Sequence, residues 1–209
     1  MKKLGLCLML CFLFLGNLAA QWSVGGKVGA NFSNLKNNSK FEGMKQRVGF
    51  NLGAVGRYQF NDWFGIQGEI LYTQYRVHND SDLHDSHQLE IEGHFVYIDD
   101  ATILSHYIDV PFLAEITPFK RIPGLNFEIG LQPGFLLKEN VSDGEYNVDT
   151  NLYDRNPVNC SLLFGAAFKF PARWYFDLRY VLGLTDNYEC YSGLNTHALQ
   201  LSLGYLFQL

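Results

Sequence analysis

The stretch "LQLSLGYLFQL", residues 199–209, decides the fold. Every second residue from Leu199 to Leu209 is apolar, and the positions between them hold Gln200, Ser202, Gly204, Leu206 and Gln208. A period of two indicates a β-strand whose two faces lie in different surroundings. The apolar face must contact either a packed protein core or lipid, and the rest of the chain decides between the two.

The same alternation recurs seven more times toward the N-terminus. The expected strands begin near Trp22, Val48, Phe64, Ile108, Phe127, Cys160 and Trp174. Their apolar faces carry no charge, whereas the opposite faces carry Lys27, Arg57, Glu69, Asp109, Glu115, Glu128, Lys138, Lys169, Asp177 and Arg179. Near the bilayer centre a Lys or Arg on the lipid face costs about 2–4 kcal/mol. The pattern therefore favours a narrow barrel with lipid outside and charges in the lumen.

The connections between these strands alternate in length. Long connections span roughly 33–47, 74–106, 139–158 and 186–196, and shorter ones separate them. This layout is typical of outer-membrane barrels, with short turns on the periplasmic side. Three tryptophans then lie at that side as an aromatic girdle, namely Trp22, Trp63 and Trp174. Because lipid cannot satisfy a free strand edge, we predict an all-β fold, an eight-stranded antiparallel up-and-down transmembrane β-barrel.

Two prolines fall inside the expected strands, Pro111 and Pro133. A proline removes one hydrogen bond from the ladder and is usually confined to strand edges or bulges. We therefore predict a local bulge at each of the two prolines.

Residues 1–20 predict a secretory signal peptide. Lys2 and Lys3 precede an apolar run, and "GNLAA" supplies a small-residue cleavage site after Ala20. The barrel domain is then 21–209, and loss of two of the 16 basic residues leaves 14 against 21 acidic ones, a net charge of −7. This charge argues against nucleic acid as a partner. Cys160 and Cys190 remain after cleavage, and the sequence leaves open whether they pair.

Seven segments in succession resemble the PorT-like outer-membrane β-barrel family of Bacteroidetes. They are "VGGKVGANFSNL", "FNLGAVGRYQFNDWFGIQGEILYTQ", "YIDVPFLAEITPF", "FEIGLQPGFLL", "LLFGAAFKF", "WYFDLRYVLGLTDN" and "LSLGYLF". The resemblance covers nearly the whole mature chain apart from the loops. It implies an eight-stranded barrel in the bacterial outer membrane and supplies no catalytic motif, and fold alone does not transfer a function.

The second long loop holds a cluster of histidines and carboxylates that could bind a metal ion. Its histidines lie among several carboxylates, and His84 and His87 are candidate ligands for Zn²⁺ or Cu²⁺ if further ligands converge. The alternative is a solvated polar loop with a hairpin near Gly93, which we favour, so we expect no metal and no cofactor. His197, with Ser192 and Asp186 nearby, reads as loop polarity rather than a catalytic trio. We expect no enzymatic activity.

The interior charges admit two interpretations. They form either the lining of a pore or a paired network that plugs the lumen, and equal numbers of both signs favour the plug. We expect a monomer with a structural or interaction role that displays extracellular loops. The alternative function is a narrow channel or an accessory factor in protein export. Expected partners are outer-membrane lipid, the barrel-assembly machinery that reads the stretch ending at Leu209, and an unidentified surface or envelope protein.

Overall fold

A computed structural model describes residues 22–36, 44–79, 88–91, 94–97, 102–119, 121–122, 124–142, 147–149, 156–185 and 195–209. Within these residues the strands are β1 Trp22–Lys36, β2 Met44–Gln59, β3 Phe64–Asn79, β4 Gln88–Ile91, β5 His94–Tyr97, β6 Thr102–Asp109, β7 Phe112–Ile116, β8 Leu125–Ser142, β9 Asn147–Asp149, β10 Val158–Lys169, β11 Trp174–Gly183 and β12 Asn195–Gln208. No helix long and apolar enough to cross a membrane occurs in the described part of the chain.

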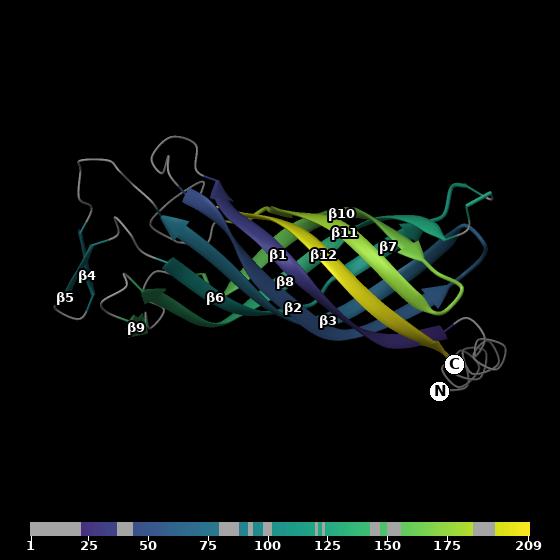
Figure 1. Ribbon diagram of the computed structural model, residues 1–209, viewed down its shortest axis with the longest axis horizontal. Helices are drawn as coiled ribbons and strands as arrows, with labels where there is room; N and C mark the ends of the chain where they lie inside the picture. The colour runs from purple at the N-terminus through teal and green to yellow at the C-terminus, as the bar shows by residue number, and fades with distance from the viewer. Residues whose placement is uncertain are drawn as a thin grey trace, which may run out of the picture.

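The main sheet closes on itself as a barrel (Figure 1). Neighbouring strands pair antiparallel, and β1 pairs with β12 from Ser23 opposite Gln208 to Lys36 opposite Asn195. β6 and β7 follow each other along one line, because both pair with β3 on one side and with β8 on the other. Counting them as one gives eight crossings in the order β1, β2, β3, β6/β7, β8, β10, β11, β12. The predicted eight-stranded barrel is confirmed.

Burial is the reverse of that in a water-soluble protein. In β12 the polar Gln200 and Ser202 are buried, while Leu201 and Leu203 are exposed. Ile70 in the middle of β3 is 61% exposed. A polar interior and a continuous apolar exterior are stable only when an apolar solvent surrounds the barrel. The stretch 199–209 therefore presents its apolar face outward.

The two ends of the barrel differ. β2 and β3, β7 and β8, and β10 and β11 are joined at the end where β1 begins and β12 finishes. β4, β5 and β9 lie at the opposite end (Figure 1). β4 and β5 pair antiparallel with Ile91 opposite His94, so the predicted hairpin in the second long loop is confirmed.

The predicted bulges at the two prolines are wrong. The register of β3 against β6 continues unchanged into β7 past Pro111, and β8 passes Pro133 in unbroken register with β10. Both proline carbonyls still accept hydrogen bonds, from the Glu69 amide and the Val110 amide, each at 2.9 Å. A missing N–H removes one bond without changing the residue spacing, and this explains why the register survives.

A bulge occurs instead in β8 beyond Pro133. His106 of β6 lies opposite Lys138, but Tyr107 lies opposite Leu136, so Leu137 is an extra residue. Leu137 and Lys138 are both exposed, and Glu139 after them is buried. The bulge therefore reverses the inward and outward positions for the rest of β8.

A second irregularity, called here the seam, is a register shift between β2 and β3. Residues 47–50 of β2 face residues 74–76 of β3 without regular pairing. Ser33 of β1 reaches across the seam: its hydroxyl donates to the Arg76 carbonyl at 2.8 Å and accepts from the Arg76 amide at 3.1 Å. A side chain thus supplies hydrogen bonds to the backbone where the regular pairing of two strands is interrupted.

Ser33→Ala is expected to lower the free energy of unfolding by about 1–3 kcal/mol, because both Arg76 backbone groups lose their partner. Ser202→Ala is the matched control, since Ser202 is equally buried but its hydroxyl has no hydrogen-bond partner. Urea titration of both variants in the same detergent measures the difference. Equal effects at the two serines would contradict the role given to Ser33.

Candidate functional site

The centre of the lumen holds a cluster of five charged residues, called here the central cluster: Lys27, Glu69, Glu128, Asp177 and Arg179. They come from β1, β3, β8 and β11 and meet because each occupies an inward position of its strand. The Arg179 guanidinium contacts three carboxylates, with Nη1 at 2.8 Å from Glu69, Nε at 2.6 Å from Glu128 and Nη2 at 3.6 Å from Asp177. The Lys27 ammonium lies 3.0 Å from Glu69 and 3.3 Å from Asp177.

A smaller group lies toward the tryptophan end and is called here the Trp-end cluster: Arg57, Glu115 and Lys169. One Glu115 oxygen accepts from both Arg57 Nε and Lys169 Nζ, the latter at 2.7 Å. The two basic side chains are partly exposed, at 14% and 16%, whereas Glu115 is buried. Eight of the ten predicted lumen charges therefore lie in these two clusters.

Asp109 lies in the lumen but is held by neutral groups. Its Oδ2 accepts from the Tyr75 hydroxyl at 3.1 Å, and Gln132 Nε2 donates to the same hydroxyl at 3.1 Å. No ion pair within the described residues involves Asp109. Tyr75 was not predicted as a lumen residue, because β3 was expected to end near Thr73. The alternation of the sequence continues through Tyr75 and Val77, and this pattern would have indicated a longer strand.

The placement of Lys138 in the lumen network is wrong. Lys138 is exposed on the outer side of β8, because the bulge at Leu137 shifts the alternation by one residue. Glu139 takes the inward position instead, and its carboxylate accepts from the Ser105 hydroxyl at 2.6 Å. No sequence signal marks this exchange, since a bulge depends on the partner strand.

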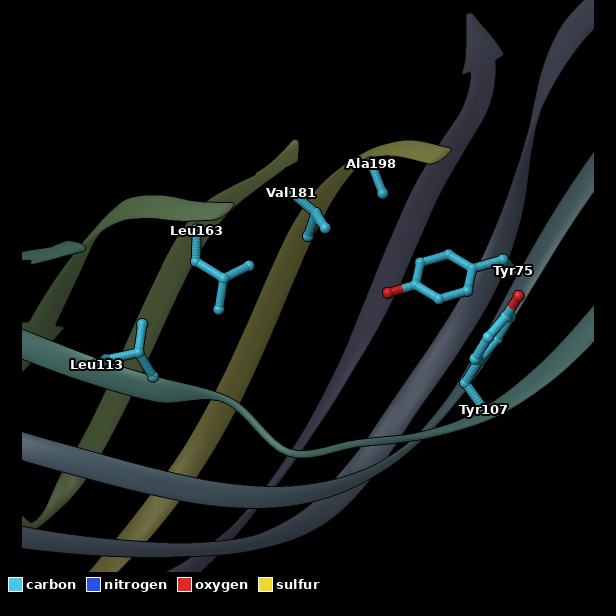
Figure 2. Close-up of a cluster of buried hydrophobic side chains, with 6 residues drawn as sticks. All are labelled: Tyr75, Tyr107, Leu113, Leu163, Val181 and Ala198. Carbon is cyan, nitrogen blue, oxygen red and sulfur yellow. The ribbon is translucent and has the colours of Figure 1, made fainter. Parts of the chain in front are cut away.

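An apolar layer fills more of the lumen. It consists of Tyr75, Tyr107, Leu113, Leu163, Val181 and Ala198, whose side chains converge from β3, β6, β7, β10, β11 and β12 (Figure 2). Leu136 packs against this layer from β8. This layer and the two ion-pair clusters are buried together in the interior of the barrel.

The three tryptophans lie on the outer surface at one end of the barrel. Trp22 contacts Tyr58, Trp63 contacts Phe64 and Trp174 contacts Tyr205, with ring centroids 5.0, 5.6 and 5.1 Å apart. Each tryptophan is about half exposed. Rings with a polar edge are typical of the level where lipid headgroups meet the hydrocarbon.

Two tyrosine–histidine pairs lie nearer the other end. The Tyr72 hydroxyl is 2.5 Å from His106 Nδ1, and the Tyr180 hydroxyl is 3.1 Å from His197 Nδ1. His197 is thus engaged with Tyr180 on the outer surface, while Ser192 and Asp186 lie outside the described residues.

Several other predicted residues lie outside the described part of the chain. These are residues 1–20 with the cleavage site, the metal candidates His84 and His87, and Cys190. Cys160 is half-buried in β10. Among the described residues no three His, Cys, Asp or Glu side chains are placed to hold a metal ion.

Comparison with known proteins identifies the family to which this chain belongs. Residues 17–189 match the model of the family described as outer membrane protein beta-barrel domain. The chain belongs to this family. Membership in a family of outer-membrane barrels places the protein in the bacterial outer membrane. No curated protein sequence matches the chain.

Two solved barrels show the same fold. The first is Ail, the attachment invasion locus protein of Yersinia pestis, solved in complex with the heparin analogue sucrose octasulfate. It is 17% identical, with a TM-score of 0.51, over 90% of this chain and 99% of Ail. The second is Neisserial surface protein A (NspA), 12% identical with a TM-score of 0.50, over 90% of this chain and 97% of NspA. At sequence identities this low, the similarity shows a shared fold and does not transfer a function.

Proposed function

We propose that this outer-membrane barrel is a non-conducting scaffold with a structural or interaction role, exercised through the segments at its extracellular end. It acts as a monomer and has no enzymatic activity. The observation that supports the proposal is the burial of two ion-pair clusters and an apolar layer in the barrel interior. Within the family, the order of the sequence motifs favours the PorT-like branch.

The packing of the lumen favours a plug over a pore. Arg179 and Glu69 have no side-chain exposure, so their charges are unavailable to passing ions. Buried ion pairs of this kind are held by mutual contact, and breaking one leaves an uncompensated charge. An ion crossing the barrel would have to separate Arg179 from three carboxylates at once. A barrel with a closed lumen cannot act as a channel, so we infer a structural or interaction role. Loops on a rigid scaffold commonly carry the residues that recognise a partner.

Planar bilayer recordings test the plug. Refolded protein, with its insertion verified by heat-modifiable gel mobility, is expected to give no steady channel current across the physiological voltage range. Arg121→Gln, which changes an exposed periplasmic residue, is expected to behave identically. Steady single-channel steps from the wild-type barrel would overturn the proposal in favour of a narrow channel.

Pull-down from detergent-solubilised membranes tests the role in protein export. The mature barrel has already been released by the barrel-assembly machinery. If its role is independent of protein export, it is expected to bring down lipid and surface or envelope proteins. Stoichiometric recovery of secretion components would establish an export accessory and overturn the independent role.

A further inference from the structure

Gly134 of β8 lies between two buried polar side chains on the inner face of the wall. It pairs with Asp109 of β6 on one side and with Asn159 of β10 on the other. Asp109 is 1% exposed and Asn159 is 7% exposed. A Cβ atom at position 134 would lie 2.5 Å from Asp109 Oδ1 and 2.3 Å from Asn159 Oδ1. The two oxygens therefore face one point in the lumen, over a residue that has no side chain.

One oxygen of the Asp109 carboxylate lacks a donor. Its Oδ2 accepts from the Tyr75 hydroxyl, whereas its Oδ1 is buried and has no hydrogen-bond partner. The Asn159 atom that faces Oδ1 is also an acceptor, and two acceptors at one point repel each other unless a positive charge lies between them. Gln132 supplies a further oxygen: its Nε2 donates to the Tyr75 hydroxyl, and its buried Oε1 has no partner.

Within the described residues no positive side chain compensates Asp109. The side chains around its carboxylate are Thr73, Tyr75 and Gln132, which are all neutral. The cations of the central and Trp-end clusters are engaged with other carboxylates, namely Lys27, Arg57, Lys169 and Arg179. An ionised carboxylate that is buried without a counter-charge is strongly unfavourable. The site therefore requires a positive charge that the described side chains do not supply.

The ligand atoms indicate which kind of cation fits. A carboxylate oxygen and two amide oxygens are hard ligands, which alkali and alkaline-earth cations prefer. A single carboxylate balances a single positive charge, and a divalent ion would leave an excess charge in the buried site. A proton joins only two oxygens, so Gln132 Oε1 would still have no partner, whereas a metal cation binds three or more.

We propose that Asp109, Asn159 and Gln132 bind one sodium ion in the lumen, over Gly134. The Asp109 carboxylate balances the charge, and the two amide oxygens replace part of the hydration shell of the ion. The ion is a fixed part of the fold, held on one side of the lumen. The site uses only residues of the wall, so it does not depend on any partner of the extracellular segments.

The test measures whether sodium stabilises the refolded full-length barrel in a neutral detergent. Urea unfolding is followed by heat-modifiable gel mobility at constant pH and ionic strength, while tetramethylammonium chloride replaces sodium chloride. Once the site is saturated, a tenfold rise in sodium concentration is expected to raise the folding equilibrium constant about tenfold, as for any ion that binds one site on the folded state alone. Equilibrium dialysis with radioactive sodium is expected to give about one ion per barrel.

Three variants separate the site from general effects of charge. Asp109→Asn keeps an acceptor for the Tyr75 hydroxyl and removes the charge, so its stability should not respond to sodium and should at least equal that of the wild type in sodium-free buffer. Asn159→Ala should weaken sodium binding about tenfold, the contribution of one polar contact to a charged group. Glu139→Gln is the matched control, because it removes another buried lumen carboxylate, which accepts from the Ser105 hydroxyl, and should keep the full response.

Stability that does not depend on sodium would overturn the proposal, because Asp109 would then be neutralised by a proton or held by the amide group of Asn159. A full sodium response in folded Asp109→Asn would place the ion elsewhere and would also overturn it. Asn159→Ala decides the question if Asp109→Asn does not fold, since an unchanged sodium affinity in that variant contradicts the site. Greater stabilisation by calcium than by sodium at equal ionic strength would contradict the monovalent assignment.

Discussion

Arg179→Met is expected to lower the free energy of unfolding by about 3–5 kcal/mol, the range for removing one partner of a buried ion pair. Arg179 has no solvent exposure and is the residue that joins Glu69, Glu128 and Asp177. Methionine fills a similar space but supplies no charge, so Lys27 alone would face three carboxylates. Urea titration in detergent micelles, followed by heat-modifiable mobility, measures the loss.

A combined variant separates lost charge balance from lost packing. Adding Glu128→Gln to Arg179→Met removes the carboxylate that Arg179 Nε held at 2.6 Å, so part of the stability should return. Arg121→Gln provides the control, because it removes a positive charge from an exposed turn and should change stability by less than about 0.5 kcal/mol. Strictly additive losses in the combined variant would show that Arg179 and Glu128 are not coupled.

Ile70→Arg is expected to destabilise the barrel by about 2–4 kcal/mol in a lipid bilayer, the cost of an Arg on the lipid face near the midplane. In a water-soluble protein the same change at a residue 61% exposed would be close to neutral. The size of the stability loss therefore shows whether lipid or water surrounds the barrel at Ile70. Equilibrium unfolding from phospholipid vesicles gives the free energy directly.

Two controls on the same strand sharpen the result. Ile70→Leu keeps the apolar character and should change stability little. Gln74→Arg places the same charge four residues nearer the extracellular edge, opposite His106 of β6, where the cost falls to about 0–1 kcal/mol. Equal costs for the two arginines would show that the boundary of the hydrocarbon does not lie at the level of Gln74.

The alternation of apolar and polar residues predicted most of the fold. Alternation such as that of Leu199 to Leu209 predicted which residues face outward, because successive side chains of a strand point to opposite faces. Eight such segments with connections of alternating length led to a closed barrel. The charges at inward positions then followed, and eight of them meet in the central and Trp-end clusters.

The errors share one cause. Pro111 and Pro133 were expected to disturb the register and do not, whereas the extra residues lie at Leu137 and within 47–50 of β2. A bulge is a mismatch between two strands, so the sequence of one strand does not locate it. The exchange of Lys138 for Glu139 in the lumen followed from that mismatch.

By itself, the sequence determined the class of fold, the direction of each face and the level of the three tryptophans, because these depend on local periodicity and on the cost of placing charge in lipid. Only the tertiary structure decided which charges touch, how Ser33 bonds the Arg76 backbone at the seam, and that Lys138 lies outward while Glu139 lies inward. Those features depend on strand register and on distances across the lumen, which are set when the sheet closes.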